Sequence, residues 1–493
     1  MAVNNPSDQL KKRERLQDSI VWGAVLSGLM RVGQIGVSLL LVRLLSPEIY
    51  GQFGVLSAIL TFFYILSMQR FMEFSFHQSD ADTDLGAQLG FGLVLHFGLF
   101  FLINLVSISL LFSEQYSVLT PYLSVASFGI LINIPRIFHS VLLQRELKWR
   151  RIRFLHLVSF VFSSIVAIGF AFAGFGLWAL VVHALLVPVP FVLDGIKRLS
   201  KTEPRRFDGA FLPTLRFGLI RSATGAVGAS QGLLESSLLS FLVGFASFGI
   251  FGRAIGLAQL LIGSLTQPLV SILYPVLAGE STNADTRRYI VGLLLRVSFW
   301  IGVPMMLLVI MFPATLVTLA FGEGWLGVVS LLPLAGILVL AQAVRQILAM
   351  ILTSQMMTRL VLLQEFFILI ATVGALAVMR DDLPLYIGSI ASVSWCVNAW
   401  MLMVILKLEL IDVKDLFRMM SGVVLGAMVA VAGRWLFGLL ILDAEFSSSS
   451  QVIIAVWVLF SMLVSVRLVD AAALGRLVVY LPGATMLRTL LRY

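Results

Sequence analysis

The sequence predicts an all-α, polytopic membrane protein with about 14 transmembrane helices, and two observations support this fold class. Of its 493 residues, 59% are hydrophobic and only 12% are charged, with a mean hydropathy of +0.99. A soluble domain carries roughly 25% charged residues because its surface faces water, so most of this chain's surface must face lipid. The apolar residues also fall into runs of about 20, the length that a helix needs to cross a bilayer core of roughly 30 Å.

Charge clusters, glycines and prolines divide these runs into 14 predicted spans. Only Gly174-Phe175-Gly176 separates the fifth span from the sixth. The apolar run after the basic N-terminal segment is too long for a signal-peptide core, so we interpret it as an uncleaved first span. The predicted spans cover residues 19–42, 49–68, 85–112, 118–142, 153–174, 176–196, 212–243, 246–278, 289–312, 326–352, 359–379, 384–406, 417–440 and 451–469.

The distribution of basic residues predicts that both chain ends lie in the cytoplasm. With that orientation, 25 of the 35 Lys and Arg residues fall on or beside inside segments, and 2 fall on outside loops. Short cytoplasmic loops of membrane proteins carry such an excess of basic residues. The loop Asp80–Asp84 is acidic and also lies inside, but acidic residues have little influence on orientation.

The sequence carries no motif that indicates an enzyme or a cofactor. It lacks GxxxxGK[ST], HExxH and any Cys/His cluster with metal-ligand spacing. Its one cysteine, Cys396, allows neither an internal disulfide nor a CxxC site. The net charge of +9 fits loops that face anionic lipid headgroups better than it fits nucleic-acid binding. We therefore expect no catalytic residue, no metal, no cofactor and no nucleic-acid partner.

An internal repeat predicts two similar halves. An aromatic-Gly-x-Phe-Gly element occurs at Tyr50–Gly54 and again at Phe248–Gly252, an offset of 198 residues. Six predicted spans separate the copies, so both halves share one orientation, as in transporters built from two parallel bundles around a central site. We expect two pseudo-symmetric six-helix lobes at 1–196 and 212–407, joined by a basic cytoplasmic linker at 197–211. Helices 13 and 14 and a basic tail then occupy 408–493.

Arginines inside the predicted spans indicate a site. A charge at mid-bilayer costs at least roughly 2.5–3.5 kcal/mol, so each is a functional hypothesis. Arg31 lies near the predicted midplane, Arg216 and Arg221 lie on the inner part of the seventh span, and Arg296 lies in the inner half of the ninth. For Arg31, Arg216 and Arg221 we expect no acidic partner at matching depth. Because guanidinium suits bidentate contact with phosphate, the four arginines predict a cationic cavity for an anionic substrate. Snorkelling toward the headgroups is the alternative.

Two acidic residues lie at the same predicted depth as an arginine. Glu235 and Arg253 are each 9 residues from the turn at Gly244, and Glu365 and Arg345 are each 10 residues from the turn at Gln355. Structural ion pairs are one interpretation. Exchange of a proton or Na⁺ at Glu235 or Glu365 during transport is the other.

Four segments resemble bacterial polysaccharide flippases of the multidrug/oligosaccharidyl-lipid/polysaccharide exporter superfamily. The stretch Arg43–Gly54 is similar to the signature between the first two helices of that family. Further matches lie at Phe251–Ala254, Tyr274–Ala278 and Phe321–Trp325. With the 14 spans, the resemblance covers nearly the whole chain.

The resemblance implies two six-helix lobes in a V shape, in the bacterial cytoplasmic (inner) membrane. It implies a substrate made of an oligosaccharide on a polyprenyl pyrophosphate, flipped to the outer leaflet by alternating access for exopolysaccharide, capsule or O-antigen synthesis. Membrane lipids, a polysaccharide polymerase and a chain-length regulator are the partners that it implies. It supplies no strict motif for the site, so the site residues rest on depth and charge.

Three other functions stay open from the sequence. A multidrug cation antiporter of the same superfamily predicts a mid-membrane carboxylate in the first six spans, where only Asp194 is found, near an inner end. A flippase for a peptidoglycan lipid precursor shares the 14-span plan. A membrane glycosyltransferase or polymerase needs catalytic residues on a long outside loop, and every predicted outside loop is short.

Overall fold

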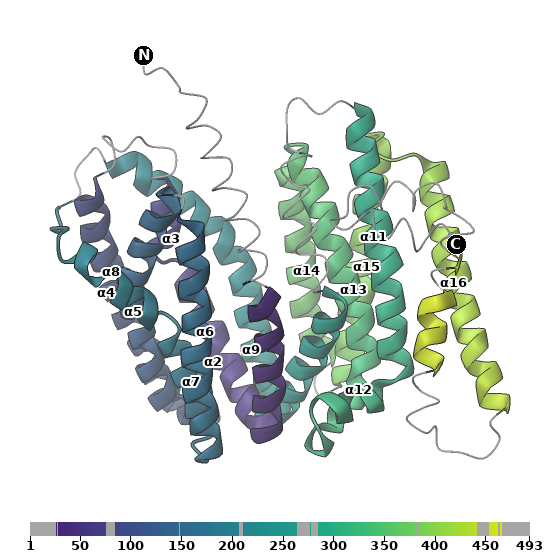
Figure 1. Ribbon diagram of the computed structural model, residues 1–493, viewed down its shortest axis with the longest axis horizontal. Helices are drawn as coiled ribbons and strands as arrows, with labels where there is room; N and C mark the ends of the chain where they lie inside the picture. Colours follow the sequence, from purple (N-terminus) through teal and green to yellow (C-terminus); the bar gives the residue numbers. More distant parts are fainter. Residues whose placement is uncertain are drawn as a thin grey trace. The chain divides into compact units, whose positions relative to one another are not determined.

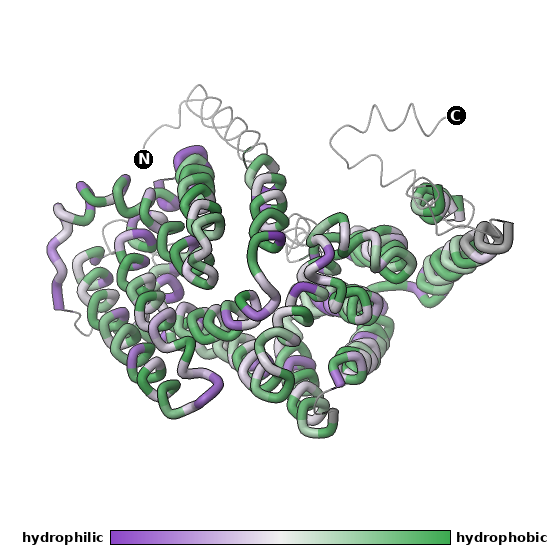
Figure 2. Tube along the Cα trace, turned by 90° about the horizontal axis from the view of Figure 1, so that it is seen from below, coloured by the Kyte–Doolittle hydropathy of each residue, from purple (hydrophilic) through white to green (hydrophobic). Residues whose placement is uncertain are grey.

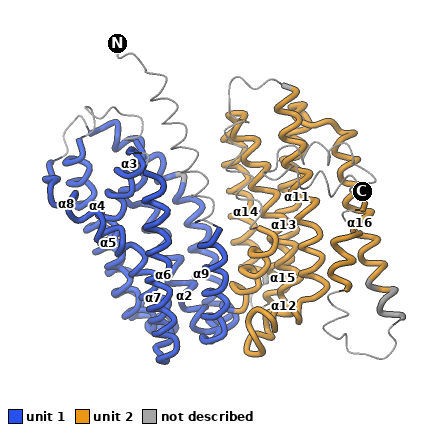
Figure 3. The backbone as a smooth tube through the Cα atoms, in the orientation of Figure 1, with its two compact units in different colours: residues 1–249 blue, residues 250–493 orange. Residues whose placement is uncertain are grey.

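The computed structural model describes residues 26, 28–74, 84–146, 148–206, 211–263, 277, 284–379, 382–440, 453–461 and 464–465. Regular secondary structure within these residues is entirely helical (Figure 1). Eleven helices in this part of the chain are long and apolar enough to cross a membrane. The chain forms two compact units, residues 1–249 and 250–493 (Figure 3).

The first unit is a helical bundle in which α5 packs against α4, α7 and α8. Buried side chains of α5 such as Leu123, Ile130 and Phe138 form part of its core. A helix at residues 28–44 precedes the labelled elements. These are α2 (Pro47–Ile65), α3 (Gln69–Met72), α4 (Leu85–Ser109), α5 (Thr120–Arg145), α6 (Trp149–Phe172), α7 (Leu177–Leu186), α8 (Val189–Leu199) and most of α9 (Leu212–Leu261).

The second unit is organised around α13, which packs against α11 and α15. Leu332, Ile347 and Ile351 of α13 are fully buried. Asn398 of α15 donates a buried hydrogen bond to the backbone oxygen of Ala341 in α13, at 2.9 Å. The helices of this unit are α11 (Ala284–Met311), α12 (Pro313–Ala320), α13 (Gly327–Ser354), α14 (Thr358–Met379), α15 (Leu383–Lys407) and α16 (Val413–Leu440).

Large apolar side chains lie exposed along these helices, as expected for surfaces that face lipid. Phe101 of α4 is 68% exposed, and Leu105 and Phe97 on the same helix are also exposed. Hydrophobic colours dominate the helical tubes in Figure 2. Soluble proteins rarely expose apolar surface on this scale, so the chain is a multi-pass membrane protein.

The helices follow the predicted spans closely, with two local differences. The predicted span 176–196 is two shorter helices, α7 and α8, which meet beside Pro188. The predicted seventh and eighth spans meet without a loop inside α9, where Gly244 alone has non-helical angles, φ 79° and ψ 164°. Gly174 and Gly176 both have positive φ between α6 and α7, as the short separator there requires. The predicted first, eighth and fourteenth spans lie partly outside the described residues.

The division between the two units falls after Gly249, whereas the predicted linker is at 197–211. The part of α9 from Leu212 to Gly249 is therefore grouped with the first unit. Residues of the linker pack on α4, because the Arg205 N–H donates to the backbone oxygen of Gly86 at 3.0 Å. The two pseudo-symmetric lobes remain a prediction. They are defined by the symmetry between the two halves of the chain, and the division into compact units does not test that symmetry.

The two copies of the repeated glycine element touch each other between α2 and α9. A Cβ added to Gly51 would meet the backbone oxygen of Phe245, and one added to Gly249 would meet the backbone oxygen of Pro47. The offset of 198 residues relates Gly51 to Gly249 and Pro47 to Phe245, so the two contacts are equivalent. Such reciprocity is the property of a contact around a two-fold axis. The repeat is thus a packing element as well as a sequence pattern.

The connection between α4 and α5 holds α9 just before Gly244. Gln115 donates from Nε2 to the backbone oxygen of Ser240 at 2.6 Å, and the Tyr116 hydroxyl donates to that of Ser237 at 2.5 Å. The last carbonyls of a helical segment lack N–H partners within the helix. Ser240 is one of these carbonyls, four residues before the break at Gly244, and Gln115 supplies its donor; Ser237 lies one turn earlier, where the Tyr116 hydroxyl adds a second contact to α9.

Candidate functional site

Arg221 on α9 faces a carboxylate at the end of α3. Its Nε and Nη2 atoms each lie 3.3 Å from Oε2 of Glu73. The other carboxylate oxygen, Oε1, accepts from Nη1 of Arg70 at 3.4 Å. The side chains of Arg221 and Glu73 are 50% and 26% exposed, so this group is accessible from one side.

Glycines on α9 bring this contact about. Gly218 and Gly225 lie three residues before and four residues after Arg221, which places all three on one face of the helix. A Cβ on Gly218 would meet the ring of Phe71, and one on Gly225 would lie 2.9 Å from Cγ2 of Ile65. The same face of α9 therefore lies directly against α2 and α3, and Arg221 emerges there beside Glu73.

Aromatic rings fix the same region of the first unit. The rings of Phe74 and Phe217 lie 5.4 Å apart, and those of Phe71 and Phe91 lie 4.8 Å apart. Phe91 of α4 also contacts Phe211 at 5.1 Å. Such aromatic pairs stabilise by about 0.5–1.5 kcal/mol beyond the burial of their area. The end of α3 and the start of α9 are thus held in place by packing that does not involve the charges.

The expectation that Arg221 has no acidic partner is wrong. Glu73 follows the second predicted span, which ends at residue 68, and it is 148 positions from Arg221 in the sequence. Comparison of depths within predicted hairpins could not find it, because α3 and α9 are joined only by tertiary packing. The short helix α3 continues the second span far enough to bring Glu73 to Arg221.

Arg31 and Arg216 are exposed in the first unit, on the helix at 28–44 and on α9. Within the part of the chain that the structure describes, neither forms a salt bridge. Arg216 precedes Arg221 by five residues on α9, so both guanidinium groups belong to the same end of that helix. Their role in substrate binding stays a prediction.

Arg296 lies in the second unit, where its Nη2 is 3.7 Å from Oδ1 of Asp415 on α16. Its side chain is only 11% exposed, in contrast to that of Arg221. The sequence did not indicate this contact, because α11 and α16 are far apart in the chain. Its predicted role in the cationic cavity is untested.

Of the two ion pairs predicted at matching depth, the structure brings one within ion-pair distance, and the other stays a prediction. Arg345 Nη1 on α13 lies 3.6 Å from Glu365 Oε2 on α14, within ion-pair distance. Gln364 also donates to Glu365 Oε1 at 3.0 Å. Glu235 and Arg253 belong to different units, and their pairing stays a prediction. A coupling role for either glutamate is likewise untested.

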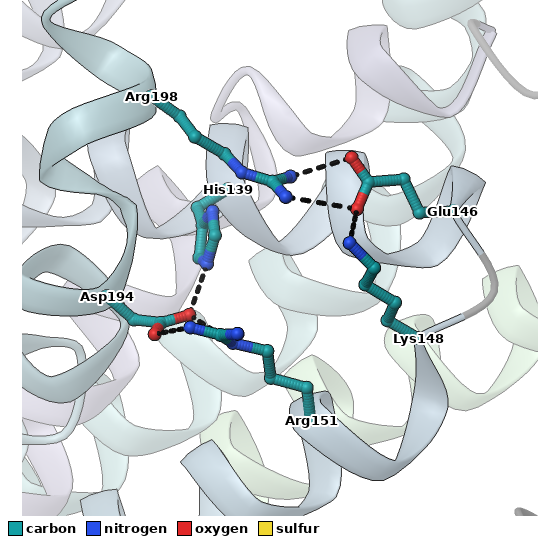
Figure 4. A network of polar contacts seen from close by, with 6 residues as sticks. All are labelled: His139, Glu146, Lys148, Arg151, Asp194 and Arg198. Carbon is teal, nitrogen blue, oxygen red and sulfur yellow. Dashed lines mark hydrogen bonds and ion pairs between the residues drawn. The ribbon is translucent and has the colours of Figure 1, made fainter.

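A polar network that the sequence did not predict joins α5, α6 and α8 in the first unit (Figure 4). His139 is almost fully buried on α5, and its Nε2 lies 2.7 Å from Oδ2 of Asp194 on α8. Arg151 of α6 donates from Nε to the same oxygen at 2.9 Å, and from Nη2 to Oδ1. The carboxylate of Asp194 thereby connects three helices.

Glu146 is the second carboxylate of this network, and it lies between α5 and α6. Arg198 donates to its two oxygens at 2.8 Å and 3.2 Å, and Lys148 Nζ lies 2.7 Å from Oε2. Partial burial opposes ionisation, but the hydrogen bonds from Lys148 and Arg198 outweigh it and hold the pKa of Glu146 below its ordinary value. A lowered pKa means that this stabilisation is present at neutral pH and is lost as the pH falls through that lowered value.

We expect Asp194→Asn to destabilise the first unit by about 1–3 kcal/mol, because it weakens the contacts of a buried histidine and of Arg151 together. Thermal unfolding of the purified protein in detergent measures this. Glu146→Gln is the matched control, since its carboxylate is more exposed and its loss is expected to cost less than about 1 kcal/mol. An unfolding temperature of Asp194→Asn equal to that of the control contradicts the prediction.

Within the described residues, no group of three or more His, Cys, Asp or Glu side chains is placed to hold a metal ion. The ion pairs described above in the first unit belong to two sets. The first is Arg70, Glu73 and Arg221, and the second is the network around Asp194 and Glu146. In the first set, a half-exposed guanidinium on a membrane helix faces a carboxylate that another arginine shares.

Known proteins share this architecture. A protein family described as "Polysaccharide biosynthesis protein" matches residues 40–330. The structure is similar to that of the lipid II flippase MurJ in an inward closed conformation, with a TM-score of 0.70 and 13% identity over 91% of this chain and 98% of that chain.

It is also similar to a multidrug resistance MATE family transporter of the MOP superfamily in an inward-facing conformation. That similarity has a TM-score of 0.57 and 15% identity over 79% of this chain and 99% of that chain. A search of curated proteins finds no match. At these identities the two structures show a shared fold, whereas the family match covers more than half of the chain. The chain therefore belongs to the polysaccharide biosynthesis protein family, and it shares its fold with the lipid II flippase MurJ and with a transporter of the MOP superfamily.

Proposed function

We propose that this protein is a flippase that moves polyprenyl-pyrophosphate-linked oligosaccharide from the inner to the outer leaflet of the bacterial cytoplasmic membrane. The substrate would serve exopolysaccharide, capsule or O-antigen synthesis, and movement would follow alternating access. The family, a multi-pass membrane fold shared with a lipid II flippase, and cations on membrane helices support this proposal.

The observation that carries the proposal is the half-exposed Arg221 on the membrane helix α9. An arginine stays charged at every physiological pH, and although Glu73 supplies one anion, the Arg221 side chain is still 50% exposed and accessible to another. The exposed Arg216 on the same helix adds a second cation. A diphosphate is the part of the substrate that needs such partners, because guanidinium groups bind phosphate oxygens with paired hydrogen bonds.

A flippase for a cell-wall lipid precursor is the second candidate. The structure most similar among those compared above carries the name lipid II flippase, and a lipid-linked diphosphate would need the same cations. A multidrug cation antiporter is less well supported. The carboxylate of Asp194, which it would use in the first six spans, already contacts His139 and Arg151.

The test compares a strain that lacks this gene with the same strain complemented with the wild-type chain. We expect the deletion strain to lose surface polysaccharide and to accumulate the lipid-linked unit in the inner leaflet, and we expect complementation to restore export. Accumulation of a peptidoglycan precursor and cell lysis would favour the second candidate. Unchanged polymer with increased sensitivity to cationic drugs would overturn the proposal in favour of the antiporter.

A further inference from the structure

We propose that Arg70 and Arg221 together form a diphosphate subsite, and that the carboxylate of Glu73 holds the place of the diphosphate when no ligand is bound. This inference rests on the proposed function and specifies which residues would recognise the charged part of the substrate. Arg70 is the new member of the site. It lies on the four-residue helix α3, outside the predicted spans, so the charges within those spans do not indicate it.

One carboxylate lies between two guanidinium groups. Glu73 Oε1 is 3.4 Å from Nη1 of Arg70, and Glu73 Oε2 is 3.3 Å from Nε and from Nη2 of Arg221. A diphosphate has two linked anionic groups, so each phosphoryl group can take one guanidinium. The single carboxylate of Glu73 reaches both cations only at 3.3–3.4 Å, longer than the usual ~2.7–2.9 Å, and a monophosphate is of similar size, so it would contact both at long distance or one of them closely. The pair of arginines therefore predicts selectivity for the diphosphate.

The contacts of Glu73 are longer than those of Glu146 and Asp194 in the same unit. Charge-assisted N–H···O hydrogen bonds normally measure about 2.7–2.9 Å. Arg221 directs two donors at a single oxygen of Glu73, and both distances exceed that range. Arg198, by contrast, binds both oxygens of Glu146, at 2.8 Å and 3.2 Å. An incoming anion can thus displace Glu73 at a lower cost than it could displace Glu146.

Exposure and support fit a binding role for the two arginines. The side chains of Arg70 and Arg221 are 33% and 50% exposed, so a ligand can reach both guanidinium groups. The backbone around them is held by Gly218, Gly225 and the aromatic contacts of Phe71 and Phe74. The helices would keep their positions when Glu73 leaves, because that packing does not depend on the ion pairs.

Binding of inorganic pyrophosphate and of orthophosphate to the purified full-length protein tests this inference by calorimetry. We expect Arg70→Ala to weaken pyrophosphate binding about tenfold and orthophosphate binding less than about twofold, since it removes one charge-assisted contact. Arg221→Ala should weaken both. Glu73→Gln should tighten both about fivefold, because it removes the internal competitor. Glu146→Gln is the matched control and should change neither.

The ratio of the two affinities decides the outcome. If Arg70→Ala leaves that ratio unchanged, or if Glu73→Gln binds no more tightly than the wild type, the subsite is refuted. Export in the deletion strain is measured separately. Gene-dependent export with an unchanged ratio in Arg70→Ala would refute the subsite and leave the flippase function standing. Normal polysaccharide in the deletion strain, with the expected affinity pattern, would refute the function and leave the subsite.

Discussion

An Arg221→Ala variant is expected to export lipid-linked oligosaccharide at least about tenfold more slowly than the wild type. A charge-assisted hydrogen bond contributes about 1.5–3 kcal/mol, and each 1.4 kcal/mol corresponds to a factor of ten. The guanidinium is half exposed on α9, so its loss removes a cation that an anionic substrate can reach. Surface polysaccharide in the complemented deletion strain, together with the amount of accumulated lipid-linked unit, measures the effect.

The fold should survive this substitution. Glu73 keeps its contact with Arg70 at 3.4 Å when Arg221 is removed, so this carboxylate retains an arginine partner. Arg198→Ala is the matched control, because it also removes an arginine from an ion pair of the first unit but one that lies in the network around Glu146. Arg221→Lys should be intermediate, since it keeps the charge and loses the paired donors. Wild-type export from an Arg31→Ala, Arg221→Ala double variant would contradict the assignment of these arginines.

Gly51→Ala and Gly249→Ala are each expected to destabilise the protein by about 3 kcal/mol, the upper end of the usual cost of overpacking. The added Cβ would meet a backbone oxygen in both variants, that of Phe245 or that of Pro47, and backbone cannot move aside as a flexible side chain can. Alanine is favoured over glycine within a helix by only about 1 kcal/mol, which does not offset the clash. The yield of folded protein and its unfolding temperature in detergent measure the loss.

The repeat itself supplies the control. Gly252 closes the second copy of the element, and a Cβ there would meet nothing within 4 Å. Gly252→Ala should therefore be neutral or slightly stabilising. The double variant of Gly51 and Gly249 should cost less than the sum of the two single costs, because both substitutions separate the same pair of helices. Equal stability of Gly51→Ala and Gly252→Ala would show that the reciprocal contact is absent.

Local signals in the sequence predicted most of the helices that the structure describes. Runs of apolar residues and the glycines at Gly174, Gly176 and Gly244 predicted where helices begin, end and turn, because hydropathy and backbone freedom act over a few residues. The repeat was visible as well, and its two copies turned out to touch. The break between α7 and α8 was not predicted, although Pro188 and Pro190 were available as a signal.

Most partners of the charges were decided by the tertiary structure. Comparing depths within a predicted hairpin correctly paired Arg345 with Glu365, because two helices joined by one turn place residues equally far from that turn at the same depth. It could not find Glu73 for Arg221, Asp415 for Arg296 or the three helices that meet at Asp194. These contacts join helices far apart in the chain, and which helix faces which depends on how side chains and glycines pack. The sequence by itself determined a membrane protein of many helices with several arginines inside its spans. The packing of α2 and α3 on α9 brought Arg221 to Glu73, where the half-exposed guanidinium can be reached by an anion.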